Sequence, residues 1–175
     1  MTRAVIARPG TDEYVPYYGT YIGKVPDGDV HGLLASQLAE TLALIRSLPE
    51  SRGAHRYAPD KWSIKEVVGH VSDAERIFSY RALRIGRGDQ TPLPGFEQDD
   101  YVPQGHFDAR TLGDLADELV AVRQATIQLF AHFDAAELER RGTASGNPIS
   151  VRALAYIIAG HERHHVGILK TRYLS

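Results

Sequence analysis

Three histidines carry the clearest chemical signal in this sequence. His161 and His165 are four residues apart, so a helix places both imidazoles on one face, one turn apart. His70 lies far upstream, in a second stretch with a helical pattern. If the two helices face each other, three imidazoles converge, and three imidazole ligands leave a metal ion with an open coordination position, as in catalytic sites. The spacing therefore predicts a metal site formed by His70, His161 and His165.

A structural interpretation of these histidines competes with the metal site, because a core histidine is often satisfied by one hydrogen bond. His161 and His165 continue the apolar face formed by Leu154 and Ile158, where leucine or isoleucine is expected. Burying two imidazoles there without a shared partner costs on the order of several kcal/mol, which a metal relieves. The other histidines lack a partner at metal spacing, and we expect His164 at a rim and His31, His55, His106 and His132 on the surface or in loops.

The pentapeptide HERHH at 161–165 also matches the zinc-protease motif H-E-x-x-H, in which the glutamate is a general base. Such proteases take their third ligand downstream. The residues that follow His165 here contain no His, Asp, Glu or Cys, so we expect the third ligand to lie upstream. This disfavours a protease and again indicates His70.

Three carboxylates lie close to these ligands in sequence. Glu162 is a possible acid or base beside the metal, although a solvated or interface carboxylate is the simpler interpretation. Glu66 and Asp73 lie about one helical turn before and after His70, where a carboxylate can orient a ligating imidazole. Glu66 is also suited to a helix cap, which leaves Asp73 as the freer candidate. The loop 95–101 could bring further polar or aromatic groups to the mouth of the site, although a solvated crossover loop with aromatic anchors is the simpler interpretation.

Four amphipathic helices position these groups. Apolar residues repeat at spacings of three and four over 30–48, 64–85, 112–133 and 151–173. Capping residues precede each range: Asp27 or Asp29, then Ser63 with Glu66, then Thr111 with Asp114, then Asn147 or Ser150. We find no convincing strand. The prediction is an all-α four-helix bundle over residues 29–175, preceded by an irregular segment, 1–28, draped over it.

The connections between these helices differ in length. The stretches 49–62 and 134–149 are moderate and favour antiparallel neighbours. The stretch 87–110 is long enough to return along a whole helix, so the second and third helices could run parallel through a crossover.

Composition narrows the class of protein. The net charge of −2 disfavours a dominant basic surface for nucleic acid. The absence of cysteine excludes disulfides, thiolate ligands and a cysteine nucleophile, and fits a reducing compartment. No apolar run is long enough for a membrane span, and the N-terminus shows no secretory pattern. We expect a cytoplasmic protein that acts on a small molecule.

Two motifs together resemble the DinB-like superfamily, which includes the YfiT group. They are WSIKEVVGH at 62–70 and GHERHH at 160–165, and the resemblance extends over about residues 30–172. It implies a four-helix bundle in up-down-down-up order, with a long crossover between helices two and three, often as a homodimer. It also implies that His70, His161 and His165 bind a divalent metal, usually zinc or nickel.

The resemblance implies more than one activity. Some members resemble S-transferases that use a low-molecular-weight thiol, and others are described as metal-dependent hydrolases. We favour the thiol S-transferase and keep hydrolysis by metal-activated water as the alternative. A non-catalytic, metal-binding stress or interaction protein is the second alternative.

Overall fold

The computed structural model describes residues 3–175, and four long helices dominate it. These are α2 (Val30–Ser47), α3 (Ile64–Gly86), α5 (Leu112–Ala131) and α7 (Val151–Ile168), which continues into a π-helical turn, Leu169–Tyr173. All four predicted helices are confirmed. Their N-caps are Asp29, Ser63, Thr111 and Ser150, each of which accepts a hydrogen bond from a first-turn N–H through its side chain.

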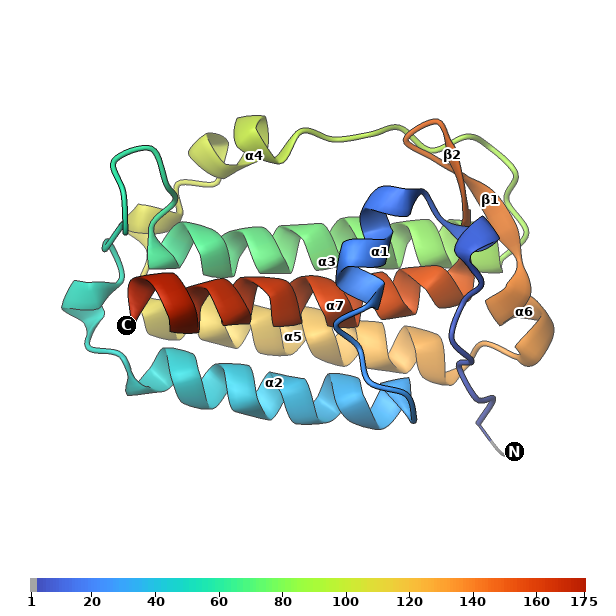
Figure 1. Cartoon of the computed structure of the whole chain (residues 1–175), viewed down its shortest axis with the longest axis horizontal. Coiled ribbons are helices and arrows are strands. Elements are labelled where there is room, and N and C mark those ends of the chain that lie inside the picture. The colour runs from blue at the N-terminus through green and yellow to red at the C-terminus, as the bar shows by residue number, and fades with distance from the viewer. Residues whose placement is uncertain (1–2) are drawn as a thin grey trace.

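The helices run in the predicted up-down-down-up order. In Figure 1, α2 and α7 run in one direction while α3 and α5 run in the other. The long crossover after α3 returns along the bundle and carries a short helix, α4 (Gln98–Gln104), before α5 begins. The parallel arrangement of the second and third long helices is therefore confirmed.

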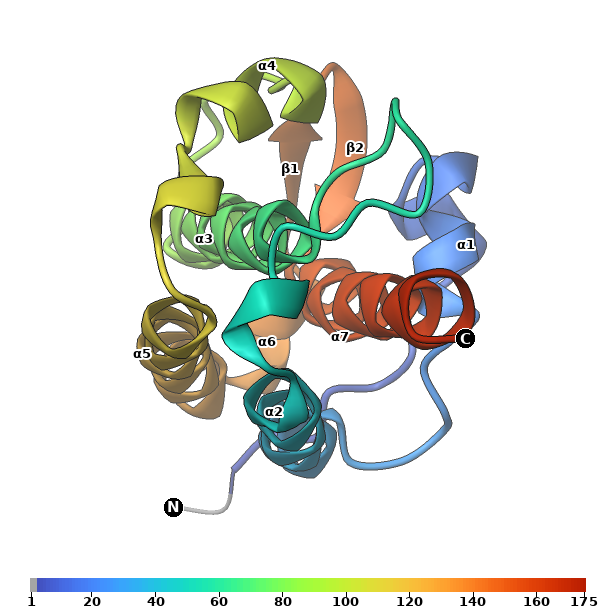
Figure 2. The same ribbon diagram turned by 90° about the vertical axis from the view of Figure 1, so that its left-hand side faces the viewer.

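The neighbours within the bundle differ from the prediction. Seen end-on in Figure 2, α5 and α7 both lie beside α2, and the same two helices lie beside α3. Helices joined by the moderate connections, α2 with α3 and α5 with α7, are antiparallel but sit diagonally. The prediction that they are neighbours was wrong, because connection length alone does not choose between an adjacent and a diagonal partner.

A β-hairpin in the connection before α7 corrects the expectation of no strand. A short helix, α6 (Ala135–Glu139), leads into β1 (Arg141–Ala144), which pairs antiparallel with β2 (Asn147–Ser150). Ser145 and Gly146 both have positive φ, the backbone of a tight two-residue hairpin turn. Leu93 of the crossover bridges to Ala144. Strands of four residues are too short to show a clear alternation, and only the Ser-Gly pair signals the turn.

The N-terminal segment is more ordered than predicted. Over its described part, residues 3–28, two 3-10 turns, Thr11–Glu13 and Pro16–Tyr18, precede a one-turn helix, α1 (Gly19–Ile22); residues 1–2 lie outside the described chain. Helix α1 packs against α7. Single turns leave no apolar repeat in the sequence, which is why the segment was expected to be irregular.

The apolar core is divided into two clusters along the bundle. One includes Leu34, Phe130 and Leu154, and the other includes Ile64 and Leu119. On every long helix, buried polar residues lie near the point where one cluster gives way to the other: Gln37 and Thr41, His70 and Glu75, Arg123, and His161 and Glu162. The chemistry-bearing residues therefore occupy a polar section in the middle of the bundle.

No helix within residues 3–175 combines the length and apolar character needed to cross a membrane.

Candidate metal centre and its pocket

The three predicted histidines come together in the polar section. Their potential ligand atoms all lie within 4.8 Å of one another. His161 Nε2 lies 3.0 Å from Nε2 of His70 and 3.1 Å from Nε2 of His165. All three residues are buried. Helix α3 supplies His70. Helix α7 supplies His161 and His165, which lie one turn apart on the same face, as the spacing of four requires.

The donor set fits a divalent ion better than a hydrogen-bonded cluster. A neutral imidazole nitrogen carries either one hydrogen or one lone pair. Hydrogen bonds alone therefore cannot satisfy both short contacts of His161 with good geometry. A single cation can accept a lone pair from each ring, and a tetrahedral ion would separate its ligand nitrogens by about 3.3 Å. The separations of His161 Nε2 from the other two rings, 3.0 and 3.1 Å, are close to that value.

Burial keeps the three imidazoles in the neutral form that binds metals. It lowers the pKa of His70 to about 4. For His165, burial first and then the charge of His70 lower the pKa to about 3. The pKa of His161 falls well below its usual value because the ring is buried beside the other imidazoles. Near neutral pH all three rings can therefore donate a lone pair.

These pKa directions predict that the metal-free protein loses stability in mild acid. In the unfolded chain the histidines take up protons near pH 6.5, whereas the folded triad resists protonation until pH 4 or below. Unfolding therefore takes up protons in this window, and the free energy of unfolding falls as pH falls. His70 alone accounts for about 2 kcal/mol between pH 7 and pH 5. Urea unfolding of the chelator-treated protein at both pH values measures the change.

The matched variant for this measurement is His70→Gln, which removes one titrating ring. Its free energy of unfolding is expected to change less between the two pH values. The same pH dependence in both proteins would show that the depressed pKa values do not govern acid stability.

Aromatic rings enclose the triad on two sides. Trp62, directly before the Ser63 cap of α3, lies 4.8 Å from the His70 ring and stacks on His165 at 6.4 Å between centroids. On the other side, Tyr21 of α1 meets His161 edge-on at 5.2 Å. The motif beginning at Trp62 therefore contributes a wall of the site as well as a ligand.

A pocket of about 260 Å³ opens beside this centre, and two of the three histidines line it. Its walls come from four parts of the chain. They are Tyr17, Tyr18 and Tyr21 of the N-terminal segment; His70, Ala74 and Phe78 of α3; Phe96, Glu97, Gln98 and Asp99 of the crossover; and His161 of α7. Residues 96–99 of the loop 95–101 do line this pocket, although a solvated crossover loop was the simpler interpretation of that sequence.

Arg81 fastens the crossover over the pocket. Its guanidinium is buried, donates to the carbonyl oxygen of Pro94 at 2.8 Å and to Ser145 Oγ at 3.0 Å, and lies over the rings of Phe78 and Phe96. One side chain of α3 therefore ties the crossover and the hairpin tip to the aromatic wall.

Gly160 allows the N-terminal segment to reach the centre. A Cβ atom at this position would lie 2.1 Å from the carbonyl oxygen of Tyr21. Only a glycine directly before His161 therefore lets the backbone of α1 pack against α7, and this explains the first residue of the GHERHH motif.

We expect Gly160→Ala to displace α1 from α7. The overlap with backbone is expected to cost about 1–3 kcal/mol, partly offset by the better helix propensity of alanine. Urea unfolding and the rate of limited proteolysis within residues 3–28 measure the effect. Gly167→Ala is the matched control, because a Cβ atom there meets nothing within 4 Å. Equal behaviour of the two variants would contradict the close-approach argument.

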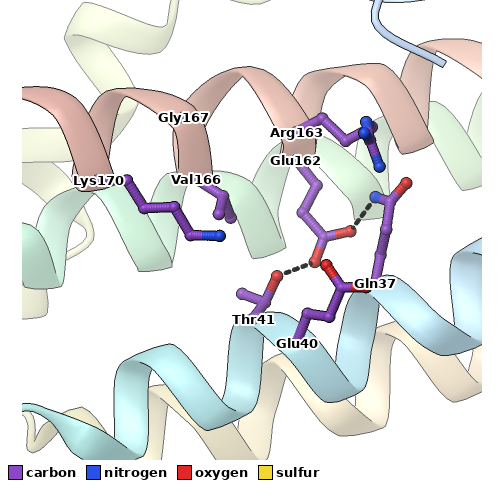
Figure 3. A pocket seen from close by; sticks show the side chains of 8 residues that line it. All are labelled: Gln37, Glu40, Thr41, Glu162, Arg163, Val166, Gly167 and Lys170. Atoms are coloured by element: carbon purple, nitrogen blue, oxygen red, sulfur yellow. Dashed lines mark hydrogen bonds between the residues drawn. The ribbon is translucent and has the colours of Figure 1, made fainter.

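Glu162 does not face the pocket beside the triad. Its carboxylate is buried and accepts hydrogen bonds from Gln37 Nε2 and Thr41 Oγ1, each at 2.7 Å, and it pairs with Arg123 at 2.9 Å. Figure 3 shows it at a separate cavity of about 160 Å³ between α2 and α7. The acid–base role suggested by its place beside His161 is corrected to a structural one, because the two residues point to different neighbours of α7.

Glu162 belongs to a polar layer that joins all four long helices. Arg123 of α5 is fully buried and makes two 2.8 Å hydrogen bonds to the carboxylate of Glu75 on α3. It also donates to the carbonyl oxygen of Leu34 on α2 at 2.9 Å. The two carboxylates and one guanidinium leave one negative charge in excess. Sequence patterns did not reveal this layer; charged residues on the apolar faces of α3 and α5 are the signal that could have.

The two carboxylates predicted to orient His70 are engaged elsewhere. Glu66 accepts from the backbone N–H of Ser63 at 2.7 Å and pairs with Arg56 at 2.5 Å. Asp73 pairs with Arg76 at 3.3 Å. Within residues 3–175, neither carboxylate makes a hydrogen bond to a ring of the triad. One helical turn of separation brings the backbone positions together, but the Glu66 and Asp73 side chains have nearer cationic partners.

The remaining histidines are mostly peripheral, as expected. His106 and His132 are exposed, and His164 is half-buried against Tyr21. His31 is the exception, since it is buried in the first turn of α2 and not on the surface. The residues around His31 in the sequence do not indicate its burial, because the groups beside it include Arg3 and Ala4 of the N-terminal segment, which lies outside the predicted helices.

Comparison with known proteins agrees with this centre. The family model of the DinB superfamily matches residues 33–169, and so covers all three histidines. A protein of Oceanobacillus iheyensis, "Putative metal-dependent hydrolase OB0413", is 24% identical over 157 residues, which cover 84% of this chain and 87% of that protein. The solved structure of YfiT from Bacillus subtilis, described as a probable metal-dependent hydrolase with an unusual four-helix bundle topology, aligns with a TM-score of 0.70. The identity is 14%, and 90% of each chain is covered. The match over most of the sequence and the shared bundle show that this chain belongs to the DinB superfamily.

Proposed function

We propose that this protein is a metal-dependent enzyme whose divalent ion is held by His70, His161 and His165. The convergence of three buried, neutral imidazoles beside a pocket carries the proposal. When bound, an ion with three such ligands keeps a position for a further ligand and lowers the pKa of a water or thiol there. Zinc or nickel is the ion we expect from the family resemblance, and imidazole nitrogen suits both.

The reaction we favour is transfer of a low-molecular-weight thiol to a small electrophile. The engagement of Glu162 supports it. Hydrolysis commonly uses a carboxylate near the ion to move protons, and both oxygens of Glu162 are occupied by Gln37, Thr41 and Arg123. The carboxylates that do line the pocket, Glu97 and Asp99, are exposed at the start of α4. A thiol made acidic by the ion needs no separate base.

Hydrolysis by metal-activated water is the second candidate. The names of OB0413 and YfiT support it, since both are described as metal-dependent hydrolases. In this chain, tyrosine hydroxyls of the pocket would then have to position the water and its proton.

One screen separates these candidates. Protein loaded with zinc or nickel is incubated with an activated aromatic halide in the presence of cysteine or glutathione, and separately with an activated ester and no thiol. Metal-dependent consumption of the halide that requires the thiol supports transfer. Ester cleavage without a thiol supports hydrolysis. Fully metal-loaded protein that is inactive across both panels would point to a non-catalytic metal-binding protein.

The quaternary structure we propose is a homodimer. A groove of about 550 Å³ between α3 and α5 supports it, because its lining is mainly apolar and Tyr80 and Leu83 are 50% and 40% exposed there. Sedimentation equilibrium of the wild-type protein and of Leu83→Glu tests it. Dissociation to a monomer is expected only for the variant.

A further inference from the structure

Two tyrosine hydroxyls stand together in the wall of the metal pocket. Tyr17 and Tyr21 both line the pocket, and their hydroxyl oxygens are 2.9 Å apart. The Tyr21 ring is in edge contact with His161, and its side chain is nearly buried. Tyr17 is 60% exposed, so the pair extends from the triad to the open side of the pocket.

The N-terminal segment is held firmly where it presents this pair. The close approach at Gly160 fixes the backbone of Tyr21 against α7. Arg8 donates to the carbonyl oxygens of Ile22 at 3.1 Å and Val25 at 2.5 Å, which fastens the chain just after α1. A hydroxyl held on such a support can act on a ligand without a large ordering cost.

One of the two hydroxyl hydrogens of this pair is not used in the hydrogen bond between them. Two phenol groups carry two hydroxyl hydrogens, and their shared hydrogen bond uses one of them. Within residues 3–175, neither hydroxyl makes a further hydrogen bond. The second hydrogen is therefore available to a group that enters the pocket.

We propose that the Tyr17–Tyr21 hydroxyl pair is a hydrogen-bond donor to the anionic ligand that occupies the pocket beside His161. This rests on the proposed function, because the ligand is drawn to that place by an ion on the triad. The ligand class is a small anion, or a substrate group that becomes anionic there, with a lone pair facing α1. The pair thereby selects ligands that can accept a hydrogen bond at this position.

The test uses cobalt-loaded full-length protein and sodium azide, a small anion that binds open positions on cobalt and accepts hydrogen bonds. Visible absorption gives the azide affinity, and elemental analysis gives the cobalt content of each protein. Loss of one hydrogen bond is expected to weaken azide binding about three- to tenfold in whichever of Tyr21→Phe and Tyr17→Phe removes the hydroxyl that carries the free hydrogen. Tyr18→Phe is the matched control, since Tyr18 lines the same pocket but its hydroxyl is outside the pair, and its azide affinity is expected to stay within about twofold.

The outcomes separate this proposal from the metal site itself. Wild-type protein that fails to bind cobalt would overturn the proposed function and this inference with it. Full cobalt content in Tyr21→Phe and Tyr17→Phe, with azide affinity equal to wild type, would overturn the hydrogen-bonding role alone. An equal loss in Tyr18→Phe would also overturn it, because the effect would then come from general packing of the aromatic wall.

Discussion

His161→Ala is expected to abolish stoichiometric metal binding. His161 is the middle member of the triad, with Nε2 at 3.0 and 3.1 Å from the other two rings, so its removal leaves two imidazoles without a common neighbour. Wild-type protein purified without an affinity tag should contain one tightly bound divalent ion per chain by elemental analysis, and the variant close to none. All metal-dependent activity should be lost with the ion.

His164→Ala is the matched control for this result. His164 lies on the same helix and touches His165 and Tyr21, yet it is not among the three converging ligands. It should retain the ion. A full metal content in His161→Ala would refute the triad, and loss of metal in both variants would indicate that α7 had been disturbed more generally.

Arg123→Met is expected to be the most destabilising single substitution of the polar layer. The guanidinium is fully buried and is the cation between Glu75 and Glu162. Methionine fills much of the volume but leaves two buried carboxylates without their cation, which costs about 3–5 kcal/mol. Chemical denaturation at neutral pH, followed by circular dichroism, measures the free energy of unfolding.

Two further variants test whether charge is the cause. Arg46→Met breaks an exposed ion pair between α2 and α5, the 2.9 Å contact with Asp117, and should cost less than about 1 kcal/mol. Adding Glu75→Gln and Glu162→Gln to Arg123→Met removes the unpaired charges and should recover part of the lost stability. If the triple variant is less stable than Arg123→Met, lost packing and not stranded charge dominates.

Much of the bundle and of the ligand set could be predicted from sequence, because both depend on local periodicity. The spacing of His161 and His165 fixes their relation on a helix, and the Ser63 capping box fixes where the helix of His70 begins. The reach of the crossover allowed the parallel direction of the second and third long helices, and the family resemblance implied it.

The parts that could not be predicted depend on contacts between distant segments. Glu162 looked available because it is adjacent to His161, but its environment is set by Gln37 and Thr41 of α2. Tyr21 lies far from the triad in sequence and reaches it only through a close backbone contact at Gly160. Neither contact involves a repeating pattern of residues, so sequence periodicity could not reveal it.

The N-terminal segment lies outside the residues that match the family model, yet it lines the pocket. The match begins at residue 33, whereas Tyr17, Tyr18 and Tyr21 precede it and still form one side of the pocket. The proposed metal ligands and the proposed hydrogen-bond donors thus belong to different stretches of polypeptide. Two relatives with the same histidines and different leading segments are therefore expected to hold the same ion and accept different molecules.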